Sequence, residues 1–253
     1  MKHSWKIART MALAVLVLAM CAVGCKNSNT VVDSSSITVS EDDAADVIAA
    51  SLGGETSTQG FSAQVAQAAR AATADSVGSD ASFRKTTATE DTATVVRQKT
   101  GLYSYDYVFR YSWTLVSGVS LSFQYSMRGK YETPRLASDD SAHAVWMVTG
   151  LGASSEYILN GTYLRLGSEG LKVRAKPSLT TTLSLHAVAV SVNKATGAIT
   201  AGTGTFTFSG KTSGGRSFAY TGTISFLGNQ LALLMLNGRQ YDVNLTLGEA
   251  ASS

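Results

Sequence analysis

The sequence predicts a mainly β protein with a short helical segment near its N-terminus, whose strands form an antiparallel meander in a curled or barrel-like sheet. Three observations predict this fold. From residue 101 onward, apolar and polar residues alternate with a period of two, which is typical of strands with one buried face. Glycine-containing turn sequences separate these stretches at hairpin spacing. Only two prolines, Pro134 and Pro177, occur in the whole chain, so little interrupts the strands.

The N-terminus has the pattern of a secretory signal peptide. Lys2, Lys6 and Arg9 precede an uninterrupted run of apolar and small residues from Met11 to Val23. That run is shorter than the ~20 residues a membrane-spanning helix needs, and it has the length of a signal-peptide core. We therefore expect a cleaved leader, with an uncleaved N-terminal anchor as the alternative.

The end of the apolar run carries a second motif. Ala22-Val23-Gly24-Cys25 resembles the lipobox of bacterial secreted lipoproteins, although leucine is commoner than alanine at its first position. The resemblance implies cleavage after Gly24 and acylation of Cys25, which would then hold the protein at a membrane of the cell envelope. Cys21 competes for this role, but the residue before it, Met20, is bulky for a cleavage site. Lys26, rather than an aspartate, follows Cys25, which by analogy favours the outer membrane in a host with two membranes.

Charge and cysteine content exclude several classes of function. Cleavage after Gly24 would remove three of the 21 basic residues and none of the 18 acidic ones, so the charges balance and no nucleic-acid partner is predicted. Cys25 would be the one remaining thiol, and His143 and His186 the remaining histidines. We therefore predict no disulfide, no metal site and no cofactor.

Between Cys25 and the β-domain, the sequence predicts a tether and two helices. Residues 26–36 are rich in Ser, Asn and Thr, as flexible tethers are. Helical spacing of apolar residues then predicts helices over 41–52, after Ser40, and over 61–73, after the helix-terminating Gly53-Gly54. Both are alanine-rich and short, so we expect them to cap the sheet, with a lid or a partner-binding hairpin as the alternative.

These patterns divide the chain into five parts. They are a signal peptide (1–24), Cys25 with its tether (25–36), a helical segment and polar linker (37–100), the β-domain (101–248) and a tail (249–253). Within the linker, Val95-Val96 favours one further strand.

The strongest alternation lies at the start of the β-domain. Apolar residues, most of them aromatic, occupy the odd positions of 103–115 and of 119–127. A three-residue loop over 116–118 keeps this parity and pairs Leu115 with Val119 and Trp113 with Leu121. The aromatic face so formed is either core under the helices, which we favour, or the wall of a pocket for an apolar ligand. Its candidate ligand-facing residues are Tyr107, Phe109, Tyr111, Trp113, Phe123 and Tyr125.

Two Asn-Gly pairs predict tight hairpins. Asn160-Gly161 would pair Ile158 with Tyr163 and place Glu156 opposite Arg165 as an ion pair. Asn237-Gly238 would pair Leu234 with Tyr241 and Ala232 with Val243. Between them, the strand over 179–192 switches the parity of its apolar residues, which indicates a β-bulge or burial on both faces.

One segment, 135–143, combines an acid, a hydroxyl and an imidazole in Asp139, Asp140, Ser141 and His143. The members of a catalytic triad normally come from separate elements, and the Asp pair lacks the spaced oxygens and the glycine of a calcium loop. We therefore expect a solvated turn instead of a hydrolase or calcium site, and predict no catalytic residue. The sequence therefore favours a non-enzymatic binding or structural domain, with an apolar ligand or an envelope protein as its partner. An envelope hydrolase that uses the 135–143 segment is the alternative.

Overall fold

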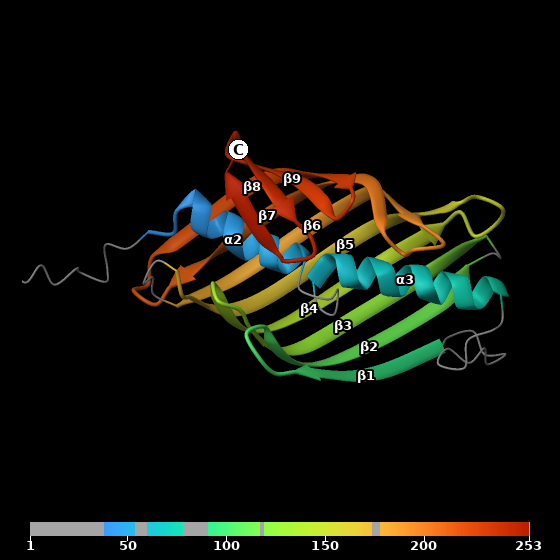
Figure 1. Cartoon of the computed structure of the whole chain (residues 1–253), viewed down its shortest axis with the longest axis horizontal. Helices are drawn as coiled ribbons and strands as arrows, with labels where there is room; N and C mark the ends of the chain where they lie inside the picture. The colour runs from blue at the N-terminus through green and yellow to red at the C-terminus, as the bar shows by residue number, and fades with distance from the viewer. Residues whose placement is uncertain (1–37, 54–59, 78–90, 117–118, 174–177, 253) are drawn as a thin grey trace, which may run out of the picture. The chain divides into compact units, whose positions relative to one another are not determined.

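Eleven strands follow one another in chain order in a single antiparallel sheet, and two helices lie across its concave face (Figure 1). The computed structural model describes residues 38–53, 60–77, 91–116, 119–173 and 178–252, which belong to one compact unit, Ser34–Ser253. The first and last strands form the two edges of the sheet, so it is curled but not closed. The predicted mainly β fold with an antiparallel meander is thus confirmed.

The two helices begin and end close to the predicted positions. Helix α2 spans Glu41–Leu52, and α3 spans Gly60–Val77. A capping box starts α2, because the Ser40 hydroxyl accepts a hydrogen bond from the Asp43 amide and the Asp43 carboxylate accepts one from the Ser40 amide. The apolar side chains of both helices belong to the same core as those of the sheet. The helices therefore cap the sheet.

The strands extend beyond the predicted β-domain at both ends. Strand β1 lies within the predicted polar linker and includes Val95-Val96, and β11 lies within the predicted tail. The bounds are β1 Asp91–Lys99, β2 Ser104–Val116, β3 Ser120–Glu132, β4 Leu136–Thr149, β5 Glu156–Leu171, β6 Leu179–Asn193, β7 Ile199–Thr212, β8 Ser217–Gly228, β9 Leu231–Leu236, β10 Arg239–Asn244 and β11 Glu249–Ser252.

The predicted register between β2 and β3 is wrong by two residues. Trp113 pairs with Phe123, and Val116 pairs with Ser120, so the loop comprises 117–119 rather than 116–118. Its residues 117–118 lie outside the described part of the chain. Because the shift is even, every side chain keeps its predicted face. The observed register brings the ring of Tyr111 to 5.4 Å from that of Tyr125 and 5.8 Å from that of Phe123.

The hairpin predicted at Asn160-Gly161 does not exist, because β5 runs straight through both residues. The pair instead marks a β-bulge against β6, where the Asn160 side-chain oxygen accepts a hydrogen bond of 2.9 Å from the Ala189 amide. Gly161 faces the core, and a Cβ atom there would lie 2.7 Å from Cε3 of Trp146. The predicted ion pair between Glu156 and Arg165 is therefore wrong, since both residues belong to β5.

The second Asn-Gly prediction is confirmed. Leu234 pairs with Tyr241 and Ala232 with Val243, and Asn237 and Gly238 have φ values of 48° and 87°, as a two-residue hairpin turn requires. The parity switch in β6 is a β-bulge at 188–191, where Ala189 has a φ of 51°.

The predicted aromatic face is buried. Tyr107, Phe109, Tyr111, Trp113, Phe123 and Tyr125 are between 0% and 6% exposed, and all belong to the core that includes both helices. From α3, the ring of Phe61 stacks on Phe226 at 5.0 Å and meets the edge of Trp146 at 5.3 Å. With both helices packed against the sheet, the aromatic face forms part of the core rather than the wall of an open pocket.

Candidate functional site

The 135–143 segment is not a solvated turn, because most of it forms the start of strand β4. Alternation along the strand places Ser138 and Asp140 on the inner, buried face, and Asp139 and His143 on the outer, exposed face. Asp140 and His143 therefore point to opposite sides of the sheet. The sequence pattern predicts a loop here because a strand would place Asp140 on the buried face, and a buried acid is rare.

The inner face instead carries a buried ion pair between Asp140 and Arg165 of β5. Their side chains are 0% and 3% exposed. The Ser138 hydroxyl donates a hydrogen bond of 2.8 Å to Asp140, and the Arg165 guanidinium lies 5.3 Å from the ring centre of Tyr131. Burial alone would lower the pKa of Arg165, but the carboxylate of Asp140 holds that pKa well above its ordinary value. Arg165 therefore stays protonated in the interior.

Two glycines make room for the bulky side chains beside this pair, Tyr107 and Glu169. Gly129 of β3 and Gly167 of β5 are the cross-strand neighbours of Asp140. A Cβ atom at Gly129 would lie 2.5 Å from Cδ1 of Tyr107, and one at Gly167 would lie 2.9 Å from the carboxyl carbon of Glu169. The pattern of alternating residues does not predict this buried polar group, although glycines at inward positions of long alternating strands are a signal for one.

Glu169 is a third ionisable group beside the pair. It is 1% exposed, and the Thr181 hydroxyl lies 2.8 Å from both of its carboxylate oxygens. Burial raises the pKa of Glu169 to about 7, against the opposing effect of Arg165. The charge of this cluster therefore changes from neutral to negative near neutral pH.

Several buried polar atoms have no hydrogen-bond partner among the residues that the structure describes. Three lie beside the ion pair or within it, two lie further along the inner face, and the other three belong to α3. They are the Tyr131 hydroxyl, Asp140 Oδ1, Arg165 Nε, the Tyr125 hydroxyl, Trp146 Nε1, Ser62 Oγ, and both side-chain amide atoms of Gln64. Such atoms are uncommon in folded proteins, and each needs a physical explanation.

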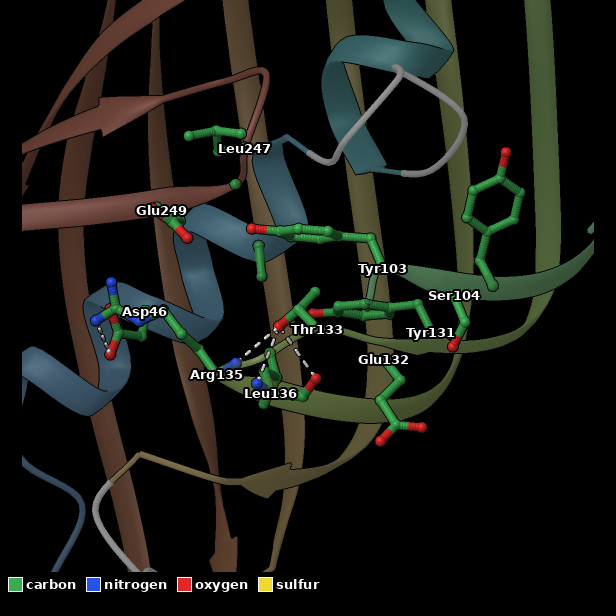
Figure 2. A pocket seen from close by; sticks show the side chains of 13 residues that line it. Asp46, Tyr103, Ser104, Tyr131, Glu132, Thr133, Arg135, Leu136, Leu247 and Glu249 are labelled. Atoms are coloured by element: carbon green, nitrogen blue, oxygen red, sulfur yellow. Dashed lines mark hydrogen bonds and ion pairs between the residues drawn. The ribbon is translucent and has the colours of Figure 1, made fainter. Parts of the chain in front are cut away.

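A narrow cleft, which we call the seam cleft, opens beside this interior. It lies where the β3–β4 turn approaches the start of β11, with α2 alongside, and Tyr103, Tyr131, Leu136 and Leu247 line it (Figure 2). At its rim, Arg135 pairs with Asp46 at 3.0 Å. The rings of Tyr103 and Tyr131 extend side by side into the cleft (Figure 2), and Tyr131 also lies against Arg165. The seam cleft thus reaches the edge of the buried polar cluster.

The seam cleft is small. Its volume is about 30 Å³, enough for a water molecule but not for an aromatic ring. None of the predicted ligand-facing aromatics lines it, and Cys25 lies outside the described residues. A cleft of this volume admits no molecule the size of a lipid chain.

Within the described ranges, no three Asp, Glu, His or Cys side chains gather closely enough to hold a metal ion. The same ranges contain no helix long and apolar enough to cross a membrane. The architecture is an open, curled antiparallel sheet wrapped around two helices, with an ion pair in its interior. Comparison with protein-family models, curated sequences and solved structures finds no match to this chain.

Proposed function

We propose that the chain is a cell-envelope lipoprotein, held at a membrane by acyl chains on Cys25, whose curled sheet is a non-enzymatic binding module. The observation that carries the anchor is the sequence Ala22-Val23-Gly24-Cys25 after an apolar run of signal-peptide length. In a host with two membranes, the proposed location is the outer membrane.

The arrangement of the ionisable groups supports binding rather than catalysis. The charge of Asp140 is compensated by Arg165, and His143 lies on the other face of the sheet. A nucleophile or general base must instead reach its substrate and be poised to exchange a proton. Asp139, Ser141 and His143 share the outer face, but residues two apart lie about 7 Å from each other along a strand, and no hydrogen bond joins these three in the part of the chain that the structure describes. The hydrolase alternative for 135–143 therefore has no assembled triad to support it.

A buried ion pair and unpartnered polar atoms also favour a binding module over a purely structural one. Apolar side chains of similar volume stabilise a core as well as a buried ion pair does, or better. Buried charged or unpartnered polar groups, which stabilise a core less than apolar side chains would, are typical of sites that recognise a ligand.

The test of the anchor is the Cys25→Ser variant in a bacterial host fed radiolabelled palmitate. We expect the wild type to take up the label and to fractionate with membranes, and Cys25→Ser to lose the label. Cys21→Ser is the matched control, because it removes the neighbouring thiol and should keep the label. A Cys25→Ser protein that still carries palmitate would contradict the lipoprotein assignment.

A further inference from the structure

Helix α3 and the inner face of the sheet enclose polar groups without hydrogen-bond partners, which a permanent core would normally supply. Gln64 of α3 is 0% exposed, and neither its amide nitrogen nor its amide oxygen has a partner among the described residues. Trp146 Nε1 and the Tyr125 hydroxyl, on β4 and β3, are in the same condition. An unmade hydrogen bond in a dry interior costs the full desolvation of its group, so docking of α3 is opposed by several such costs.

The apolar contacts that favour docking of α3 are modest. Among the side chains of α3 that the structure describes, Phe61 is the one large apolar side chain that is buried, and it packs on Trp146, Tyr163 and Phe226. The rest of its buried apolar surface comes from Val65 and alanines, which bury little area each. Helix α3 is thus held by one aromatic anchor and by a hydrogen bond of 3.0 Å between the hydroxyls of Thr73 and Tyr157, above an interior with unsatisfied polar groups.

We propose that the space between α3 and the sheet is a binding site for an uncharged amphipathic molecule, which enters when α3 moves away. Its apolar chain or ring would lie along the buried aromatic face, which includes Phe123 and Tyr125. Its hydroxyl or amide group would bond to the groups left unpartnered in the closed form. This inference rests on the proposed binding function and names the ligand class of that module.

The charges on the inner face of the sheet favour an uncharged ligand. Arg165 and Asp140 compensate one another, so neither a single cation nor a single anion awaits a partner. Glu169 adds a negative charge when it is ionised, which disfavours an anionic head group. The unpartnered atoms include donors, such as Trp146 Nε1, and acceptors, such as Gln64 Oε1, so they match a group that both donates and accepts.

Binding that requires an open form has a quantitative consequence. The apparent affinity falls in proportion to the open fraction, so a substitution that stabilises the closed form must weaken binding. Gln64→Leu is such a substitution, because it keeps a similar volume and removes both unpartnered amide atoms. If Gln64 were an ordinary core amide hydrated by an internal water molecule, Gln64→Leu would lower the stability of the protein instead of raising it.

The test compares full-length variants in their binding of N-phenyl-1-naphthylamine, an uncharged apolar amine whose fluorescence rises on burial. We expect Gln64→Leu to raise Tm by ~3 °C or more and to weaken binding about tenfold. Trp146→Phe, which removes another unpartnered donor but keeps a ring, should change binding in the same direction. Gln124→Leu, on the exposed outer face, is the control and should match the wild type. The leader is common to all variants, so its own binding cancels.

A Gln64→Leu protein with a lower Tm, or with unchanged probe binding, would overturn the proposal and leave α3 as a permanent cap. This outcome is separable from failure of the proposed anchor, because the probe assay does not depend on acylation. Conversely, palmitate labelling of Cys25 does not depend on the interior site.

Discussion

Glu169 is the residue whose protonation changes the charge of the interior. It lies beside a compensated ion pair, so its ionised form adds one uncompensated negative charge to a buried cluster. The Thr181 hydroxyl partly supports that charge with its hydrogen bond. Since desolvation outweighs this support, the folded protein binds a proton at Glu169 more tightly than the unfolded chain does.

We therefore expect stability to depend on pH through Glu169. Its pKa is raised in the folded state, so the stabilising contribution is complete below pH 4.5 and is lost as pH rises through about 7. The shift from 4.5 to about 7 corresponds to about 3 kcal/mol across this window. Urea unfolding at a series of pH values measures it.

Glu169→Gln is the matched variant, because it keeps the shape and cannot ionise. Its stability should be nearly flat where that of the wild type falls between pH 5 and 7. Parallel curves for the two proteins would show that Glu169 does not hold the raised pKa.

At the scale of elements, the β9–β10 hairpin depends on backbone conformation at its turn. Gly238 has a φ of 87° and no atom within 4 Å of the place where a Cβ would lie, so only the backbone disfavours a side chain there. We expect Gly238→Val to lower the free energy of unfolding by more than ~1 kcal/mol in thermal or urea unfolding. Gly152→Val is the control, because that site also has open space but lacks a positive φ. Equal stability of the two variants would contradict this account of the turn.

The elements also show how far the sequence alone leads. The alternation of apolar and polar residues predicts the correct face for the side chains of β2 and β3, because successive side chains of a strand point to opposite faces. It could not determine the offset between the strands, which depends on ring contacts such as Tyr111 with Tyr125. Asn160-Gly161 misled for a related reason. Its glycine is required by Trp146 on the next strand, and such a contact leaves no local signal.

The candidate site was harder to predict than the fold. The sequence marks Asp140 as a notable acid but predicts a turn for its segment. It also pairs Arg165 with Glu156 instead of Asp140. The first error follows from the assumption that charged residues mark exposed positions, and the second follows from the hairpin predicted at Asn160-Gly161. A long-range pair across β4 and β5 becomes visible only once strand register is known.

At the scale of the whole molecule, a curled open sheet encloses two helices whose interfaces with it differ. Helix α2 is tied down by polar contacts, since Arg135 pairs with Asp46, and Tyr241 donates to Asp42 at 2.9 Å. Helix α3 is held by Phe61 and by a hydrogen bond between the Thr73 and Tyr157 hydroxyls, and it covers unpartnered polar atoms. The two helices should therefore differ in how readily they leave the sheet.

Amide hydrogen exchange of the full chain, resolved by segment, tests this central claim most directly. We predict that amides of α3 exchange at least about tenfold faster than those of α2 and of the central strands β4–β6, through a local opening that leaves the sheet intact. Exchange of α3 at the same rate as the central strands would mean that it leaves only on global unfolding, and would contradict the account.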